Sequence, residues 1–247
     1  MKKVALITGG AKGIGKAIAI ELAKAGCDVV INFHTSKDEA EQLAKSLNEQ
    51  YGVKAVAIGC DVSNESEVED MAKKIEETFG GIDILVNNAA VDLSCLWHEK
   101  TVEIFKKTLD VNLMGAYIVS RRFYKHMIDK KCGRIINISS TNGINTYYPV
   151  CMEYDASKAA LISLTHNLAI EFAPYINVNA VVPGFIGTES ELDGYTPEFL
   201  KSEQEKILLG RYGEPEEVAK LVRFLASDDA SYINNSIIRI DGGQLGS

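Results

Sequence analysis

Two residues that together could transfer a proton, Tyr154 and Lys158, stand four positions apart. Apolar residues at three- and four-residue spacing follow, from Leu161 to Leu168, and stop before Pro174, which predicts an amphipathic helix with both residues on one face. A tyrosine titrates near pH ~10, and a neighbouring ammonium favours the phenolate. Lowering that pKa to neutrality takes about three units, or ~4 kcal/mol. Taken alone, the pair favours two ordinary surface side chains, so a catalytic role requires a cofactor site beside it.

The rest of the chain alternates short apolar runs with amphipathic segments. Strict alternation with short loops predicts an α/β fold, in which a doubly wound parallel sheet of about seven strands has helices on both faces. No composition break, linker or repeat is present, so we expect one domain over residues 1–247. The expected strands are 4–7, 29–31, 55–58, 82–86, 134–138, 177–181 and 237–240, and the main expected helices are 13–25, 38–47, 68–79, 101–109, 113–127, 154–172, 197–207 and 215–226.

Composition narrows the class of protein. A hydrophobic content of 46%, a charged content of 24% and a net charge of −8 are those of a globular protein with no basic stripe, which argues against nucleic-acid binding. The five cysteines show no CxxC or Cys/His ligand spacing, so we expect neither a metal site nor a disulfide framework. No apolar run approaches ~20 residues and the first strand begins without a signal peptide, which predicts a cytoplasmic protein without membrane contact.

A glycine cluster occupies the turn between the first expected strand and helix. Gly9, Gly13 and Gly15 have the spacing G-x-x-x-G-x-G, which differs from the usual G-x-G-x-x-G fingerprint. A pyrophosphate site needs a tight turn, close backbone approach and a helix N-terminus, and Ile14 falls within that helix start. A merely tight turn does not need three glycines. The cluster therefore predicts a dinucleotide-binding loop.

The end of the second strand indicates which dinucleotide binds. An acid there would bind the adenosine ribose hydroxyl of NAD(H), but no acid occurs before Asp38. Lys12 lies inside the glycine loop, where a cation can meet a 2′-phosphate. Both features predict NADP(H) rather than NAD(H). His34, Thr35 and Ser36 are candidate phosphate contacts, although each is equally compatible with a solvated loop.

Two further strand ends carry polar residues. Asp61 and Val62 follow the third strand, in position to contact an adenine, and Asn88 and Ala89 follow the fourth. In sheets of this kind, ligands bind beyond the carboxyl ends of the strands. We therefore expect all four residues to contact the cofactor.

Taken together, these motifs resemble the short-chain dehydrogenase/reductase family, and the resemblance covers essentially the whole chain. It implies a Rossmann-type fold, nicotinamide-dependent hydride transfer to or from a small carbonyl or alcohol substrate, and usually a homotetramer. A basic residue before the second glycine, as Lys12 is here, is associated in that family with NADP(H). The motifs are 8–15, Asp61-Val62, Asn87-Asn88-Ala89, Asn112, Ser139-Ser140, 154–158 and 183–188.

The resemblance also implies a role for each catalytic position. Tyr154 would be the general acid in reduction and the base in oxidation, and Lys158 would lower the Tyr154 pKa and hold the nicotinamide ribose. Ser140, preferred over Ser139, would polarise the substrate carbonyl. Asn112 would anchor a water-linked proton relay to Lys158.

Residues after the sixth strand would contact the nicotinamide. The resemblance implies this role for Pro183, Gly184, Ile186 and Thr188. The chain departs from the family pattern elsewhere, with Ala90 replacing a usual glycine. Asn235 replaces a second glycine, and asparagine tolerates the left-handed backbone that such a turn requires.

The substrate stays open between two classes. The closest overall resemblance is to 3-oxoacyl-acyl-carrier-protein reductases, which implies an acyl-carrier protein as a candidate partner. The segment Val91-Asp92-Leu93-Ser94-Cys95 departs from that group's usual Ile-Thr-Arg-Asp, and the stretch 189–199 resembles the lid of hydroxysteroid dehydrogenases about as well. Ring ketones and sugar alcohols are therefore alternatives. Candidate wall residues of an apolar pocket are Trp97, Tyr147, Tyr148, Met152 and Tyr195.

A non-catalytic NADP(H) sensor is the remaining alternative. A pure binder does not require a proton donor beside a hydride donor. The intact set of Asn112, Ser140, Tyr154 and Lys158 therefore argues for an enzyme.

Overall fold

The computed structural model describes residues 2–246 and contains one seven-stranded parallel sheet. Its spatial order is β3-β2-β1-β4-β5-β6-β7, and every pairing between neighbours is parallel. The predicted doubly wound sheet is confirmed. The strands are β1 Val4–Ile7, β2 Asp28–Phe33, β3 Ala55–Gly59, β4 Ile84–Asn87, β5 Gly133–Ile138, β6 Ile176–Pro183 and β7 Ile237–Ile240.

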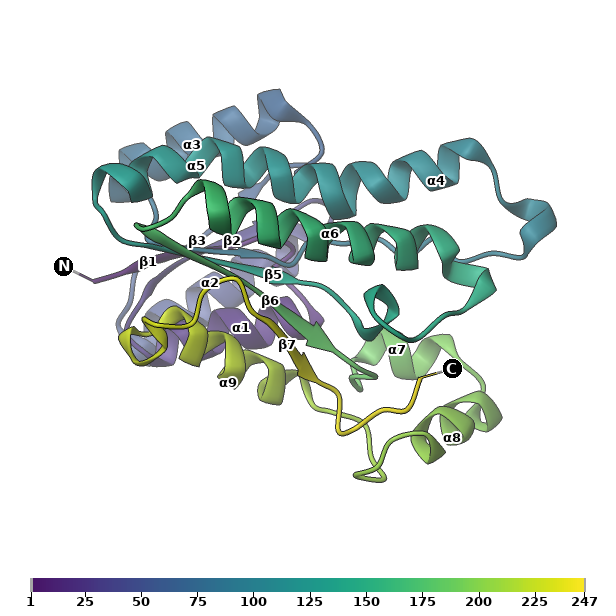
Figure 1. Cartoon of the computed structure of the whole chain (residues 1–247). Coiled ribbons are helices and arrows are strands. Elements are labelled where there is room, and N and C mark those ends of the chain that lie inside the picture. Colours follow the sequence, from purple (N-terminus) through teal and green to yellow (C-terminus); the bar gives the residue numbers. More distant parts are fainter. Residues whose placement is uncertain (1, 247) are drawn as a thin grey trace.

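The order of the strands reverses at β1. Ile7 in β1 pairs with Ile31 in β2 on one side and with Val86 in β4 on the other. The loops after β1 and β4 therefore separate to opposite faces of the sheet and open a crevice between them. Because all strands are parallel, every carboxyl end lies at the same edge, on the right of the sheet in Figure 1.

Helices cover both faces of the sheet (Figure 1). One layer contains α1, α2 and α9, and the other contains α3, α4, α5 and α6, whereas α7 and α8 lie beyond the carboxyl edge. The helices are α1 Gly13–Lys24, α2 Lys37–Tyr51, α3 Glu65–Phe79, α4 Val102–Leu109, α5 Ala116–Asp129, α6 Met152–Glu171, α7 Glu189–Gly194, α8 Pro197–Glu205 and α9 Pro215–Ala226. Short 3-10 turns are η1 Trp97–Glu99, η3 Thr141–Gly143, η4 Pro149–Cys151 and η5 Asp228–Ala230, and η2 Asp110–Gly115 is a π-turn.

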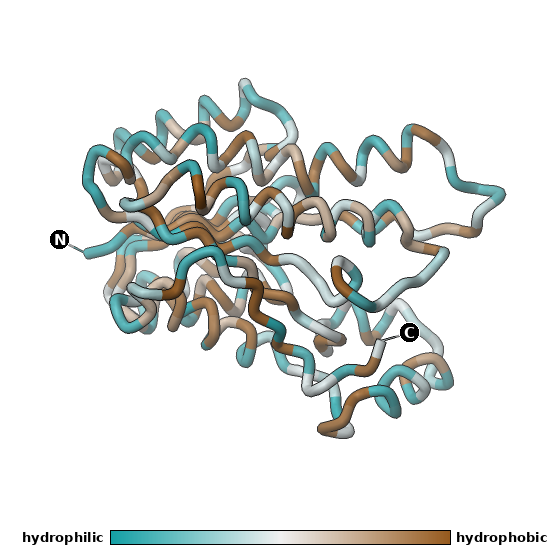
Figure 2. Tube along the Cα trace, in the orientation of Figure 1, coloured by the Kyte–Doolittle hydropathy of each residue, from teal (hydrophilic) through white to brown (hydrophobic). Residues whose placement is uncertain are grey.

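Two hydrophobic clusters fill the space between the sheet and its helix layers. Because side chains alternate along a strand, Ala5 and Ile7 pack in one cluster, whereas Val4 and Leu6 pack in the other. Figure 2 shows the apolar residues concentrated in the sheet and on the inward faces of the helices. At about 25 cal/mol per Å² of apolar surface, this burial is the main stabilising contribution to the fold. None of the helices in residues 2–246 is long and apolar enough to cross a membrane.

Most helix and strand ends differ from the sequence-based boundaries by a few residues, and three of the differences bear on the site. The π-turn η2 joins α4 to α5 where a break was predicted after residue 109, so the chain stays helical from 102 to 129. The helix α7 forms within the stretch 189–199, and β4 begins at Ile84 rather than at residue 82. Asn235 has φ 59°, which confirms the predicted left-handed turn.

Candidate active site

The glycine loop joins β1 to α1 at the crevice. Gly9 and Gly13 have φ 61° and 50°, values that glycine adopts without strain. Lys12 is the N-cap of α1, and its side chain makes no capping hydrogen bond. The first amides of α1 therefore receive no acceptor from the N-cap side chain, and the positive end of the helix dipole faces the crevice. An anion such as a pyrophosphate fits this loop.

The loop has no room for a side chain at Gly15. A Cβ atom there would lie 2.3 Å from the carbonyl oxygen of Gly9 and 2.6 Å from Nδ2 of Asn88. That same amide nitrogen donates to the carbonyl oxygens of Thr8 and Gly9, each at 3.0 Å. Asn88, which was predicted to contact the cofactor, therefore also holds the glycine loop in place.

Thr8 is a site residue whose role sequence reasoning missed. Its Oγ1 accepts the backbone amides of Asn88, at 2.9 Å, and Ala89, at 3.0 Å. It also donates to the carbonyl of Val86 at 3.3 Å. The side chain thus joins the end of β1 to the end of β4. The sequence signal that could have indicated this role is a hydroxyl-bearing residue directly after the apolar strand 4–7.

A cavity of about 270 Å³ adjoins the glycine loop. It brings together the residues predicted to bind the adenosine half of the cofactor. Among the lining residues are Gly9, Lys12, His34, Thr35, Ser36, Asp61, Val62 and Ala89.

The residues from the end of β2 that line this cavity include no acid. Asn32, the polar residue at that end, is buried and accepts the Gly9 amide at 3.2 Å through Oδ1. Its Nδ2 donates to the carbonyl of Cys60 at 3.0 Å. The ammonium of Lys12 lies 2.7 Å from the Glu39 carboxylate on α2, at the surface of the loop. The end of β2 therefore presents an amide where an NAD(H) site would present a carboxylate, and the Lys12 ammonium lies on the adjoining glycine loop.

A second cavity, of about 700 Å³, continues from the first. Lys12 and Ala90 line both, so an elongated ligand can extend along the glycine loop from one cavity to the other. Predicted residues lining the second cavity are Lys12, Gly13, Ile14, Gly15, Asn88, Ser140, Tyr154, Lys158, Pro183, Gly184, Ile186 and Thr188.

Tyr154 and Lys158 project from one face of α6, as predicted. Lys158 Nζ lies 5.3 Å from the centre of the Tyr154 ring and donates to the carbonyl of Ile138, at the end of β5, at 2.8 Å. Burial lowers the pKa of Lys158 to about 8.

The pKa of Tyr154 departs in the direction opposite to the one that the resemblance implied. Burial raises it, the charges of Asp92 and Glu191 raise it further, and a hydrogen bond with Ser140 opposes them. The chain's own residues therefore keep the phenol protonated.

The two adjacent serines have different surroundings. Ser139 is buried, and its Oγ donates to the carbonyl of Lys158 at 2.8 Å. Both serines line the second cavity, and the Ser140 hydroxyl bonds to Tyr154 and to the amide of Asn142. The Ser139 hydroxyl is committed to the α6 backbone, whereas the Ser140 hydroxyl lies beside the Tyr154 phenol.

Asn112 lines neither cavity. Its side chain is buried in the π-turn, where Oδ1 accepts the amide of Val91 at 2.8 Å and Nδ2 donates to the Val91 carbonyl at 3.0 Å. Nδ2 also donates to Ser157 Oγ at 3.0 Å. Within residues 2–246, no hydrogen bond joins this side chain to Lys158. Its observed contacts hold the loop after β4 against α6.

A buried ion pair that sequence reasoning missed lies directly beside Tyr154. The ammonium of Lys100 is 2.6 Å from the Glu153 carboxylate, and both side chains are buried. Lys100 also donates to the carbonyl of Val150 at 2.7 Å. These contacts attach the loop after β4 to the start of α6, so they position Tyr154. The two residues are 53 positions apart in the sequence, so no local pattern indicated that they pair.

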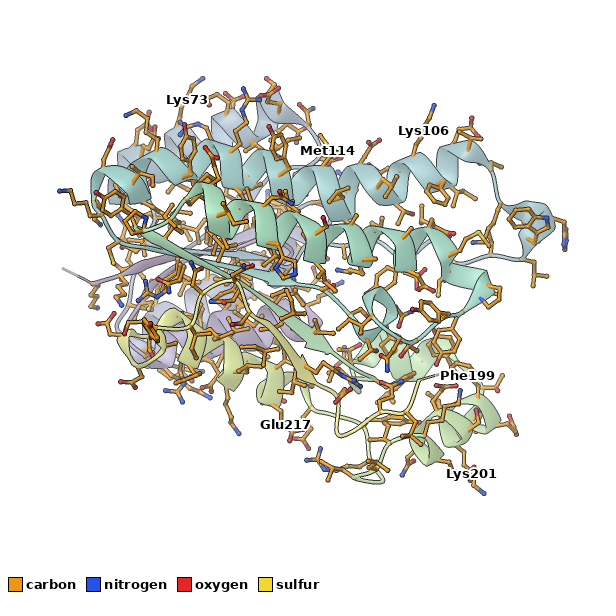
Figure 3. The ribbon with its side chains drawn as sticks, viewed as in Figure 1. Lys73, Lys106, Met114, Phe199, Lys201 and Glu217 are labelled. Atoms are coloured by element: carbon orange, nitrogen blue, oxygen red, sulfur yellow. The ribbon has the colours of Figure 1, made fainter. Side chains whose placement is uncertain are left out.

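Aromatic side chains form one wall of the second cavity. Tyr148 and Tyr195 line it as predicted. The prediction is wrong for Trp97, Tyr147 and Met152, which are not among its lining residues. Trp97 is 75% exposed to solvent. Phe185 and Phe199 complete the wall. Figure 3 shows Phe199 at the start of α8, with Lys201 pointing away from the body of the molecule.

The residues present fit a dinucleotide. No side chain caps α1 from the N-cap position, the loop has no space for a Cβ atom at Gly15, and the loop borders two contiguous cavities. Within residues 2–246, no group of three or more His, Cys, Asp or Glu residues could hold a metal ion.

Comparison with known proteins gives consistent matches over nearly the whole chain. A family described as Enoyl-(Acyl carrier protein) reductase matches residues 9–244. The chain is 41% identical over 245 residues to the 3-oxoacyl-[acyl-carrier-protein] reductase FabG of Aquifex aeolicus, covering 98% of this chain and 97% of that protein. It is 35% identical over 244 residues to Glucose 1-dehydrogenase 2 of Bacillus subtilis, covering 98% and 94%. The structure of a putative gluconate dehydrogenase from Agrobacterium tumefaciens superposes with a TM-score of 0.91 at 31% identity, covering 98% and 95%.

The fold and these relatives define an oxidoreductase that uses a nicotinamide cofactor. The chain belongs to the short-chain dehydrogenase/reductase family, and it is an enzyme that acts on CH–OH groups of small molecules.

The close contact between η3 and α6 gives a first prediction. A Cβ atom at Gly143 would lie 2.7 Å from the carbonyl carbon of Lys158, inside contact distance of rigid backbone. Gly143→Ala should displace α6, lower kcat and reduce the free energy of unfolding by about 1–3 kcal/mol. Urea unfolding and turnover measure both effects. Gly187→Ala is the matched control, since its nearest contact would be 3.7 Å. Equal behaviour of the two variants would contradict the proposed contact.

The buried Lys158 gives a second prediction, about stability against pH. Its pKa is lowered from 10.5 to about 8 in the folded chain, so the unfolded chain binds more protons between these values. The free energy of unfolding of the wild type should therefore rise as pH rises from 8 to 10.5, and the same contribution is lost as pH falls from 10.5 to 8.

Lys158→Met removes this titration. Its stability relative to the wild type should be highest at pH 7 and should decline toward pH 10.5, as measured by urea unfolding at each pH. A stability difference that stays constant across this range would show that the ammonium is not buried at a cost.

Proposed function

We propose that this enzyme interconverts a ketone and a secondary alcohol with NADP(H), using Tyr154 as the acid and base. The observation that carries the proposal is the meeting of Tyr154, Ser140 and Lys158 in one cavity with the glycine loop of α1. A proton donor, a carbonyl-polarising hydroxyl and a nicotinamide site are the groups that such a reaction requires.

The proposed chemistry follows from the state of each side chain. When bound, the nicotinamide supplies or accepts the hydride. The Ser140 hydroxyl donates a hydrogen bond to the substrate carbonyl, and the raised pKa of Tyr154 keeps its phenol protonated for transfer to that oxygen. In alcohol oxidation the Tyr154 phenolate, which forms as pH rises, receives the proton. The ammonium of Lys158, held on the Ile138 carbonyl, lies on the same side of α6 and is available to the ribose of the cofactor.

Asn112 enters this proposal as a positioning residue. Its side chain is committed to Val91 and Ser157, so the relay that the resemblance implied would have to use the backbone of the π-turn and not the side-chain amide. A π-turn supports this, because its altered hydrogen-bond pattern frees backbone groups near functional sites.

NADP(H) is proposed in preference to NAD(H) because Lys12 supplies a cation near the adenosine ribose site and no acidic residue follows β2 before Asp38. Lys12 lines the adenosine cavity together with His34, Thr35 and Ser36, and Asn32 occupies the β2 end with its amide fully engaged. Pro183, Gly184, Ile186 and Thr188 are proposed to border the nicotinamide, since all four line the second cavity.

The names of the relatives support two substrate classes. A 3-oxoacyl thioester, with an acyl-carrier protein as partner, is supported by the 41% identity to the Aquifex aeolicus reductase. A sugar is supported by the 35% identity to the Bacillus subtilis enzyme, and specifically by two carboxylates in the second cavity, Asp92 and Glu191.

We also propose a homotetramer. Apolar side chains remain exposed along the outer side of α4, η2 and α5, which suits contacts between copies of the chain. They are Val102, Phe105, Met114, Tyr117 and Tyr124, and Figure 3 shows Met114 on this side of the molecule.

Removing the phenolic hydroxyl tests the proposed acid. Tyr154→Phe should keep NADPH affinity within about twofold and lose 10²-fold or more of kcat, as general acids contribute about 10²–10⁴-fold. Fluorescence titration measures affinity, and NADPH consumption with a diketone measures turnover. Tyr232→Phe, at a fully exposed tyrosine, is the control. A Tyr154→Phe variant that keeps the wild-type kcat would contradict the proposed role of Tyr154 as the acid.

The cofactor preference has its own test. The wild type should use NADPH with a higher kcat/KM than NADH. Lys12→Ala should lower kcat/KM for NADPH by about 10-fold, as expected for a charge-assisted phosphate contact, and leave NADH nearly unchanged. Lys16→Ala, one turn along α1 and exposed, is the matched control. Equal losses with both cofactors in Lys12→Ala would contradict the 2′-phosphate contact.

A further inference from the structure

The C-terminal segment brings into the second cavity a side chain that the proposed reaction does not use. Gln244 follows β7 and lines this cavity, although the residue is only 5% exposed. Its backbone is held firmly, since its N–H donates to the carbonyl of Asp241 at 3.0 Å and its carbonyl accepts from Arg239 at 3.0 Å. The side chain therefore has a fixed starting point at the edge of the cavity.

The side-chain amide of Gln244 uses only one of its two ends within the protein. Oε1 accepts the backbone amide of Phe185 at 3.1 Å, and this donor determines which end of the amide is the oxygen. A Cβ atom at Gly184 would lie 2.5 Å from the same oxygen, so the amide packs directly on the chain after β6. Within residues 2–246, Nε2 has no hydrogen-bond partner, and it is not among the polar atoms that the protein encloses completely. The two N–H groups therefore face the cavity.

The surroundings of Gln244 place this donor on the substrate side of the site. Phe185, whose amide it binds, belongs to the aromatic wall of the second cavity. On the other side, a Cβ atom at Gly246 would lie 2.6 Å from the carbonyl oxygen of Asn145, in the segment that follows Ser140. Gln244 thus lies between the aromatic wall and the segment that carries the proposed carbonyl-polarising hydroxyl.

An unpaired donor that is shielded from bulk water calls for an acceptor from the ligand. Ser140 and Tyr154 are proposed to bind the oxygen of the reacting carbonyl, so the oxygen that meets Gln244 must be a second one. Asp92 and Glu191 line the same cavity, which favours an uncharged oxygen over a carboxylate.

We propose that Gln244 is a specificity-determining residue, which donates a hydrogen bond from Nε2 to a second, uncharged oxygen of the substrate. This inference rests on the proposed function and deepens it, because it names a residue that selects among ketones. Gln244 takes no part in hydride or proton transfer. Its replacement should therefore change the choice between substrates more than the chemical step.

The test compares three ketones of equal chain length on the full chain. NADPH oxidation is measured at pH 8 with 2-heptanone, which has one oxygen, with 2,3-heptanedione, whose second carbonyl is adjacent, and with ethyl acetoacetate, whose ester carbonyl is one carbon further away. At least one of the two compounds with a second carbonyl should give a kcat/KM about 10-fold or more above that of 2-heptanone. A second carbonyl also activates the first, so the informative quantity is the change of this ratio in variants.

Two variants separate the proposed contact from a structural role. Gln244→Glu keeps an oxygen for the Phe185 amide and replaces the N–H donors with a carboxylate oxygen, whereas Gln244→Met removes both groups. Each should lower the ratio about 10-fold, mainly through KM, and Gln244→Glu should keep its Tm and, in a fluorescence titration, its NADPH affinity. Gln42→Glu, the same change at an exposed position on α2 that lines neither cavity, is the matched control.

The outcomes distinguish this inference from the proposed function. An unchanged ratio in Gln244→Glu would overturn the inference and leave Gln244 the single task of holding the Phe185 backbone. A loss of NADPH affinity at an unchanged ratio would overturn it by placing the amide against the cofactor. In both cases, continued Tyr154-dependent turnover would leave the proposed function standing. Absence of turnover with all three ketones, or turnover that does not depend on Tyr154, would overturn both.

Discussion

The site depends on the close seating of α6 against the end of β5. Lys158 reaches across that contact to the Ile138 carbonyl, and Ser139 returns a hydrogen bond to the Lys158 carbonyl. Gly143 makes the contact possible, since a side chain there would meet the α6 backbone. The buried ammonium is costly, as its lowered pKa indicates. This cost of burying the Lys158 ammonium falls at a position beside Tyr154, where the charge is available to the proposed cofactor and proton donor.

The crevice at the reversal of strand order places the remaining groups around this contact. Thr8 and Asn88 join the ends of β1 and β4, so hydrogen bonds tie the glycine loop to the start of the loop that carries Asp92. The Lys100–Glu153 pair connects that loop to the start of α6. Hydrogen bonds and one buried ion pair thus hold three segments, distant in sequence, within reach of a single ligand.

Much of this arrangement could be predicted from the sequence, because alternating apolar runs and a glycine turn constrain a parallel sheet strongly. Most predicted site residues line the two cavities, since the carboxyl ends of parallel strands share one edge. The side-chain contacts of Asn112 and the direction of the Tyr154 pKa shift could not be predicted, because they depend on packing between distant segments. The same holds for Glu191, whose place at the cavity follows from the unexpected helix α7.

The pH dependence of kcat/KM, measured in both directions with one ketone and its alcohol, tests the central claim most directly. If the Tyr154 phenol transfers the proton, kcat/KM for ketone reduction should fall as pH rises through the Tyr154 pKa of the NADPH-bound enzyme. The kcat/KM for alcohol oxidation should rise as pH rises through the Tyr154 pKa of the NADP⁺-bound enzyme. Profiles that are flat in both directions, or that turn at unrelated values and persist in Tyr154→Phe, would contradict the account.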